Sequence, residues 1–125
     1  MLQKENRLRG KKEWEVLFNE GNFVGAKFLT MKVWKINTEK YPRRQFLVDD
    51  LKIGFSVGLK ISKSAVKRNS VRRKMSEVIR LLLKENKIKH GFLVGFMAKN
   101  NILEADYQEI EKDIIFCLKK MGLLI

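Results

Sequence analysis

Apolar residues recur along the chain with two different periods, and together these periods predict helices alternating with strands. A period near 3.6 residues predicts three helices, and strict alternation predicts the strands between them. The helices are expected over residues 11–20, 64–86 and 106–121. The strands are expected over residues 28–36, 51–59 and 91–98, with a short extra strand over 22–26. The pattern predicts an α+β fold: a single-domain α/β sandwich over residues 1–125, with one mixed sheet of about four strands and the order αβββαβα.

The longest expected helix, 64–86, combines an apolar stripe with a row of cations. Its stripe consists of Val71, Met75, Val78, Ile79 and Leu82, which share one side at 100° per residue. The opposite side carries Asn69, Arg73, Arg80, Lys84 and Lys87, with Arg72 and Lys74 flanking it. We therefore expect the helix to bury its stripe against the sheet and to present the cations to solvent.

Small residues mark two places where the chain should pack closely. Gly54, Ser56 and Gly58 share one face of the expected strand 51–59, so another segment is expected close against that face. Gly21 is placed to cap the first helix. Cys117 lies on the apolar stripe of the last helix and is expected to fill the core.

The net charge of the chain predicts a binding function in addition to a fold. The formal net charge is +13, and residues 60–89 hold 11 Lys or Arg against only Glu77 and Glu85. Such an imbalance opposes compaction and predicts a polyanionic partner, nucleic acid first and an anionic membrane surface second. Arginine suits phosphate because its planar fork can donate two parallel hydrogen bonds.

Several other classes of protein are not favoured. A single cysteine fits a reducing compartment, and there is no apolar run for a membrane span or a signal core, so a cytoplasmic location is expected. His90, the only histidine, falls in an expected turn. We find no Cys/His metal cluster, phosphate-binding glycine loop or serine–histidine arrangement, and so expect neither a metal site nor catalytic residues on the protein.

The landmarks along the chain together resemble the protein component of bacterial ribonuclease P. The segment Lys67-Arg68-Asn69-Ser70-Val71-Arg72-Arg73 is similar to the family's Arg-Asn-Arg signature, although Ser70 replaces the usual second arginine. Further similarities are the upstream strand 52–57, the opening helix with Trp14, Phe18 and Gly21, and the closing segment 105–113. The resemblance covers about residues 6–124.

The resemblance implies a subunit of a ribonucleoprotein endoribonuclease that removes the 5′ leader of precursor tRNA. Hydrolysis would belong to the RNA subunit and its magnesium ions, with no cofactor on the protein. The implied partners are ribonuclease P RNA and precursor tRNA, with no membrane and no obligatory protein partner. The residues expected to bind the RNA subunit are Lys67, Arg68, Asn69, Arg72, Arg73 and Arg80.

A second surface, a cleft between the first helix and the sheet, is implied for the single-stranded leader. Aromatic rings stack on bases, and cations near strand ends meet phosphates. The residues expected to line this cleft are Arg7, Trp14, Phe18, Lys32, Ser56, Lys60 and Lys99.

Three rival functions remain open from the residues alone. A ribosomal protein or RNA chaperone would share the basic face but would not prefer substrates that carry a leader. A peripheral membrane protein is disfavoured because the apolar stripe of the basic helix has a sheet to cover. An independent nuclease would need metal-binding carboxylates within the basic body, where acids are few.

Overall fold

A four-stranded sheet forms the centre of the molecule in the computed structural model, which describes residues 2–40 and 46–125. The strands lie in the order β1-β2-β4-β3. The β1–β2 and β2–β4 pairs are antiparallel, whereas β3 and β4 are parallel. The strands are β1 (Asn22–Gly25), β2 (Leu29–Lys35), β3 (Leu51–Ser56) and β4 (Phe92–Ala98). The expected mixed sheet is confirmed. The sequence also indicates a surface connection over residues 38–44, around the single proline Pro42, and this segment lies partly outside the described residues.

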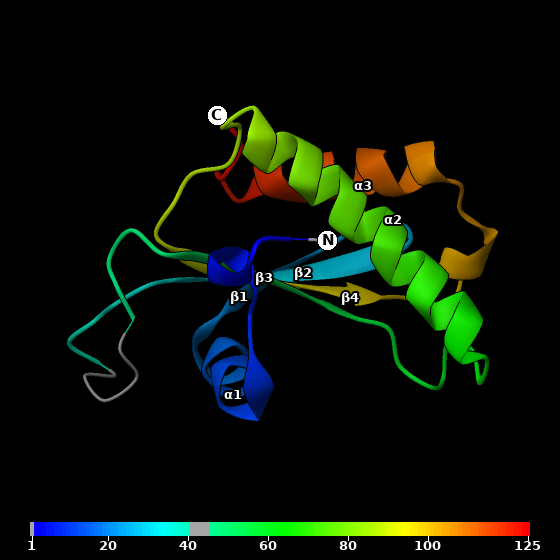
Figure 1. Ribbon diagram of the computed structural model, residues 1–125, viewed down its shortest axis with the longest axis horizontal. Coiled ribbons are helices and arrows are strands. Elements are labelled where there is room, and N and C mark those ends of the chain that lie inside the picture. The colour runs from blue at the N-terminus through cyan, green and yellow to red at the C-terminus, as the bar shows by residue number, and fades with distance from the viewer. Residues whose placement is uncertain (1, 41–45) are drawn as a thin grey trace.

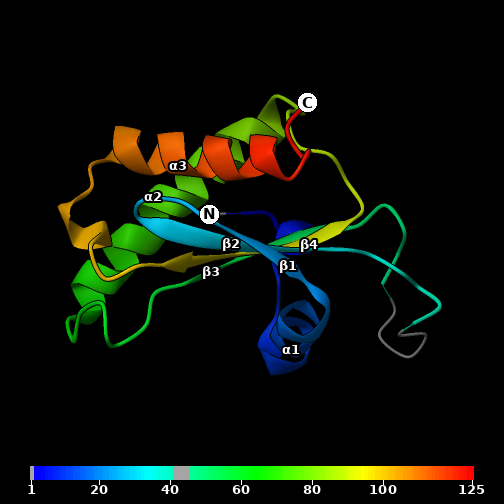
Figure 2. The ribbon, with the colours of Figure 1, turned by 180° about the vertical axis from the view of Figure 1, so that it is seen from behind.

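Helices cover both faces of this sheet. The helix α1 (Gly10–Glu20) lies on one face, and α2 (Ala65–Lys84) and α3 (Tyr107–Lys120) lie together on the other (Figures 1 and 2). Short 3₁₀ turns, Lys4–Asn6 and Ile102–Glu104, precede α1 and α3. The expected order αβββαβα and the sandwich are confirmed. Because α1 packs over β2 and β4, part of the sheet on its side stays uncovered.

Two apolar clusters hold these layers together. The larger lies between the sheet and the α2–α3 layer and includes the fully buried Met31, Met75 and Phe96. The smaller lies on the α1 side, where Leu17 and Leu93 are fully buried, with Trp14 packed against the cluster. Burying apolar surface on both sides of one sheet fixes the position of each helix relative to the strands.

The helix α2 follows its expected apolar stripe but is shorter than expected. Val71, Met75, Val78 and Ile79 are buried, and the Ser64 side chain caps the helix by accepting a hydrogen bond from the Lys67 backbone N–H at 3.3 Å. The helix ends at Lys84 because Asn86 takes a left-handed conformation, with φ 55°. The expectation that Lys87 continues the cation row is therefore wrong.

The strand expected over residues 51–59 is also shorter, since β3 ends at Ser56. Beyond it, the Val57 carbonyl accepts a hydrogen bond from Arg72 NH2 at 3.1 Å, and the chain turns where the Ile61 N–H bonds to the Gly58 carbonyl. These contacts direct the chain away from the sheet and into the start of α2.

The glycine-rich face of β3 receives a bulky partner, as expected. A Cβ atom added to Gly54 or to its neighbour Gly95 on β4 would lie 2.6 Å from the ring of Trp14. Gly21 does cap α1, yet its φ of −78° is not left-handed. A side chain there is excluded by the Leu17 carbonyl, 2.5 Å from the added Cβ.

Replacing Gly95 by alanine should destabilise the fold by about 1–3 kcal/mol, because the new methyl overlaps the Trp14 and Leu17 side chains. The measurement is the urea midpoint of unfolding. Gly58→Ala is the matched control, since nothing lies within 4 Å of an added Cβ at that position. Equal losses of stability for the two variants would contradict the close packing of the Trp14 ring against Gly95.

The C-terminal helix α3 begins with a reciprocal cap and buries the only cysteine. The Asp106 side chain accepts from the Glu109 backbone N–H at 2.8 Å, and the Glu109 carboxylate accepts from the Asp106 N–H at 3.2 Å. Cys117 is fully buried on the inner face of this helix, which confirms its expected place in the core.

Burial raises the pKa of the Cys117 thiol to about 11, with the Asp113 carboxylate as a smaller cause. Since the folded protein keeps a proton that the unfolded chain releases, stability is complete below the ordinary thiol pKa and falls as pH rises to 11. We expect the free energy of unfolding to fall by about 1.4 kcal/mol per pH unit in that window. The Cys117→Ser variant should not show this fall. Urea unfolding of both proteins between pH 8 and 11 checks this, and parallel curves would contradict it.

Candidate nucleic-acid interface

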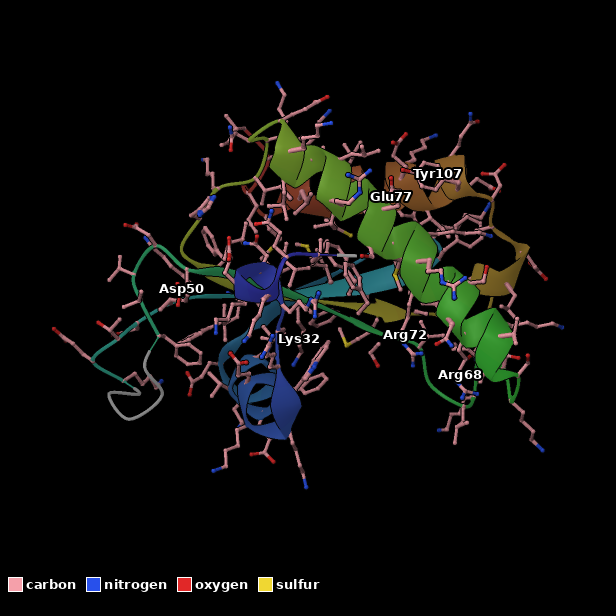
Figure 3. The ribbon with its side chains drawn as sticks, in the orientation of Figure 1. Lys32, Asp50, Arg68, Arg72, Glu77 and Tyr107 are labelled. Carbon is pink, nitrogen blue, oxygen red and sulfur yellow. The ribbon has the colours of Figure 1, made fainter. Side chains whose placement is uncertain are left out.

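The first half of α2 holds its arginines in place without neutralising them. Arg68 donates from NH1 to the Ser62 carbonyl at 2.8 Å, and Arg72 donates from NH1 to Asn69 Oδ1 at 2.8 Å. Figure 3 shows Arg68 and Arg72 near the N-terminal part of this helix. A carbonyl or amide oxygen orients a guanidinium and leaves its positive charge available to an anion. The two arginines are therefore positioned before any partner arrives.

Three further α2 cations face solvent. Lys67, Arg73 and Lys84 are exposed, and within the described ranges no carboxylate or carbonyl oxygen holds the Arg73 guanidinium. The ion pairs among the described residues are Lys40–Glu20, Lys52–Glu13 and Arg80–Glu77, so only the last involves α2. The expected row of uncompensated cations is thus present without two of its members: Lys87 lies beyond the end of α2, and Arg80 is paired with Glu77.

Arg80 forms a two-pronged ion pair with Glu77 on the same helix. Arg80 Nε and NH2 lie 2.9 and 2.7 Å from the two carboxylate oxygens. The hydrogen bond from Arg80 lowers the pKa of the Glu77 carboxyl, and the same bond raises the pKa of the Arg80 guanidinium. Among the cations predicted to bind RNA through α2, Arg80 therefore contributes the least uncompensated charge. The i, i+3 spacing of the two residues was the sequence signal for this pair.

The α1 side of the sheet carries a second set of the predicted residues. Lys32 pairs with Gly95, and Gly95 pairs with Gly54, so these three residues form one row across the sheet. The next row is formed by Thr30, Met97 and Ser56. Residues paired across neighbouring strands point to the same face, so Lys32 and Ser56 share the α1 side, where Figure 3 shows Lys32. Trp14 covers the two glycines, and we call the remaining part of this side, formed by Thr30, Lys32, Ser56 and Met97 with Phe18 at its edge, the open sheet face.

Two aromatic rings of α1 border the open sheet face, and they differ in exposure. Trp14 is half-buried against the glycine row, whereas the Phe18 side chain is 48% exposed. Their rings stack with centroids 5.8 Å apart. Lys32 Nζ lies 5.0 Å from the Phe18 ring centre and donates to the Phe18 carbonyl at 2.9 Å. Phe18 is consequently the more exposed of the two rings, with Trp14 stacked against it.

Sequence reasoning missed another aromatic residue on this face. Phe23, on β1, pairs with Lys32, points to the same side and is 69% exposed. The expected short strand over 22–26 contained the signal, but the register that places Phe23 beside Lys32 comes only from the folded hairpin. Phe18, Lys32 and Phe23 thus combine two aromatic rings with a cation, an arrangement suited to single-stranded nucleic acid.

Two predicted lysines lie at the far ends of the strands. Lys99 follows β4 and donates to the Ala26 carbonyl, and Lys60 is exposed in the turn after β3. Lys27, Asn100 and Asn101 surround Lys99 in a shallow hollow. The two lysines extend the positive charge of the open sheet face beyond the sheet.

Arg7 does not lie on this surface, which corrects its expected place. Arg7 forms a parallel bridge with Ile53, whose side chain is buried on the α2 side of the sheet. The bridge points Arg7 to that side, where its Nε donates to the Leu2 carbonyl at 2.8 Å. Leu8, the next residue, takes the α1 side instead and packs against Gly54. Successive side chains of an extended segment point to opposite faces, so Arg7 is separated from the other residues of the expected cleft.

Arg7 instead lines a groove on the α2 side. This groove, of about 680 Å³, lies between the N-terminal segment, the outer edge of β3 and the middle of α2. We call it the edge groove. Its lining residues are Leu2, Arg7, Leu8, Ile53, Gly54, Phe55, Arg72, Arg73, Ser76 and Glu77.

Other kinds of site find no support in the described residues. Histidine, cysteine and carboxylate side chains form no group of three suited to a metal ion within residues 2–40 and 46–125. The His90 ring lies 3.2 Å from the Asp49 carbonyl on an exposed loop. In the same part of the chain, no helix has the length and apolar character to cross a membrane.

Comparison with known proteins matches the chain to one protein family. The family model Ribonuclease P matches residues 2–122. The ribonuclease P protein component of Clostridium botulinum strain 657 is 33% identical over 120 residues, covering 96% of this chain and 97% of the relative. The ribonuclease P protein component of Alkaliphilus oremlandii is 31% identical over 119 residues, covering 95% of this chain and 93% of the relative.

Solved structures share the fold. The Staphylococcus aureus RNase P protein superposes with a TM-score of 0.78 at 18% identity and covers 98% of this chain and 100% of that one. The Thermotoga maritima RNase P protein superposes with a TM-score of 0.73 at 20% identity. The match covers 91% of this chain and 96% of that one.

Proposed function

Because the chain belongs to the bacterial ribonuclease P protein family, and is thus a protein subunit of the ribonucleoprotein endoribonuclease of tRNA 5′ maturation, we propose how it divides its surface between two RNAs. The cations of α2 bind ribonuclease P RNA. The open sheet face binds the single-stranded 5′ leader of precursor tRNA. The two surfaces lie on opposite sides of the sheet, so both RNAs can be held at once (Figures 1 and 2).

The assignment of α2 to the RNA subunit depends on one observation. Arg68, Arg72 and Arg73 keep their positive charge, and the first two are oriented by carbonyl and amide oxygens of their own chain. Arginines oriented beforehand lose less conformational freedom when they bind phosphate. Each phosphate that they neutralise also releases condensed counterions, which makes the affinity depend steeply on salt.

The assignment of the open sheet face to the leader follows from its composition. Phe18 and Phe23 offer aromatic faces to unpaired bases, and Lys32 lies between them to meet a phosphate. Duplex RNA hides its base faces by stacking, so exposed rings favour a single strand. Ser56, Lys60 and Lys99 continue this surface toward the ends of β3 and β4.

We assign the hydrolysis, and the magnesium ions that support it, to the RNA subunit. The side chains of the two surfaces are cations, amides, hydroxyls and aromatic rings, and these do not fit a divalent cation, which prefers carboxylate oxygens. The protein acts by binding and positioning the two RNAs.

Reconstitution tests this function. The protein is added to bacterial ribonuclease P RNA at low magnesium concentration, and cleavage at the 5′ end of precursor tRNA is measured. We expect stimulated cleavage, and tighter binding of precursor tRNA than of mature tRNA. Absence of stimulation would overturn the proposal. Stimulation without preference for a leader would favour a general RNA chaperone, because only the α2 surface would then be in use.

A further inference from the structure

The edge groove is built differently from the rest of the α2 surface. Its floor is apolar, with Leu2 and Ile53 both more than nine-tenths buried and Phe55 half-buried beside them. A row of cations that only neutralised phosphates would have no need of such a floor. We propose that the edge groove binds the base of one unpaired nucleotide of the RNA subunit, an inference that rests on the function proposed above.

The outer edge of β3 supplies polar groups to this groove. The Asn6 side chain donates to the Leu51 carbonyl at 2.9 Å, the Leu8 N–H donates to the Ile53 carbonyl at 3.1 Å, and Arg72 donates to the Val57 carbonyl. Every second residue of a strand points its N–H and C=O to the same edge. Phe55 is the residue of this series between Ile53 and Val57, so its N–H and C=O face the groove. A donor and an acceptor side by side match the hydrogen-bonding edge of a nucleobase.

Charge around the groove favours a nucleotide over a neutral apolar ligand. Arg7, Arg72 and Arg73 lie on its rim and can contact the phosphates on either side of the bound base. Glu77 is the one acid of the lining, and both of its oxygens are engaged by Arg80. The pairing reduces the repulsion that this carboxylate would otherwise exert on a phosphate. The rim thus complements a polyanion while the floor accepts a flat, weakly polar ring.

The short free stretch of the β3 edge argues against a longer occupant. Its volume of about 680 Å³ is within the range of pockets for small ligands. A peptide strand added to β3 would need several free backbone groups in succession. Here the N-terminal segment already occupies the edge at Ile53, and Arg72 occupies it at Val57. The free edge between them has room for one nucleotide.

Filling the groove tests the proposal. Ser76 lines the groove from α2 and is half-buried, so Ser76→Phe places a ring where the base would lie. Ser76→Leu fills it with less bulk, in case phenylalanine destabilises the fold. Leu81→Phe is the matched control, because Leu81 is exposed on the same helix and does not line the groove. Thermal unfolding of each variant shows whether it is folded.

The measurement is chemical probing of ribonuclease P RNA, with dimethyl sulfate and a carbodiimide, in complex with each full-length protein. We expect the wild type to protect the base edge of at least one unpaired nucleotide. Ser76→Phe and Ser76→Leu should restore its reactivity and weaken the complex about tenfold. Leu81→Phe should keep both the protection and the affinity.

Three results would overturn the inference. They are an unchanged footprint in both Ser76 variants, protection confined to paired nucleotides, and protection that appears only in the leader of added precursor tRNA. If the wild type stimulates low-magnesium cleavage and yet protects no unpaired base, only the groove is wrongly assigned. If the wild type neither binds the RNA nor stimulates cleavage, the proposed function itself fails.

Discussion

Replacing Arg72 and Arg73 together by glutamine should weaken association with ribonuclease P RNA by about a hundredfold at low salt. Each arginine contributes a charge-assisted contact worth roughly 1.5 kcal/mol to phosphate, and the two losses add to about two orders of magnitude. The plot of log affinity against log salt concentration should also flatten by about 1.4–1.8 units, since two phosphates keep their counterions. Filter binding or fluorescence anisotropy over a range of salt concentrations measures both quantities.

The ion pair on α2 provides the control for this experiment. The double variant Glu77→Gln/Arg80→Gln removes one positive and one negative charge, so the net charge is unchanged. It should therefore bind the RNA far more tightly than Arg72→Gln/Arg73→Gln. A hundredfold loss in both double variants would show that the oriented, uncompensated arginines have no special role. Circular dichroism melting controls for the hydrogen bond between Arg72 and the Val57 carbonyl, which the first variant loses.

Replacing Phe18 by alanine should reduce the affinity of the holoenzyme for precursor tRNA by about tenfold and leave mature tRNA binding nearly unchanged. The physical reason is the loss of one base stacked on an exposed aromatic ring, worth about 1–3 kcal/mol. The measurement is the dissociation constant of the holoenzyme for the two substrates, which differ only in the leader. Trp14→Ala is a poorer test, because the half-buried Trp14 ring fills the space above Gly54 and Gly95.

The fold offers a matched control for Phe18. Phe116 is 48% exposed, the same fraction as Phe18, but it belongs to α3 on the opposite side of the sheet. Phe116→Ala should bind precursor and mature tRNA as the wild type does. Equal weakening of both substrates by Phe18→Ala, or a leader-specific loss in Phe116→Ala, would contradict the assignment of the leader to the open sheet face.

Much of the architecture could be predicted because it depends on local periodicity. The stripe of α2 is readable since residues three and four apart must share a helix side, whatever the rest of the chain does. The same reasoning located the buried Cys117 and the row that contains Arg73. The close approach to Gly54 was also predictable, because a strand face without side chains demands a near neighbour.

The errors of prediction concern the ends of elements and the direction of single side chains. The strand expected to reach Leu59 ends at Ser56, and the helix expected to reach Asn86 ends at Lys84. Arg7 was expected in the leader cleft and points to the α2 side. In these cases the deciding contact comes from a distant part of the chain or from a single backbone conformation, neither of which a periodic pattern records.

The sequence by itself determined that this protein has a basic helix with a buried back, a sheet with helices packed against it, and a charge that favours a polyanionic partner. These follow from charge and from repeating apolar positions, which act over a few neighbouring residues. Only the tertiary structure decided which cations stay uncompensated, that Phe23 lies beside Lys32, and that Arg7 and α2 enclose a groove. Those features depend on strand register and on contacts between residues far apart in the chain, because long-range pairing brings together groups that no local pattern relates.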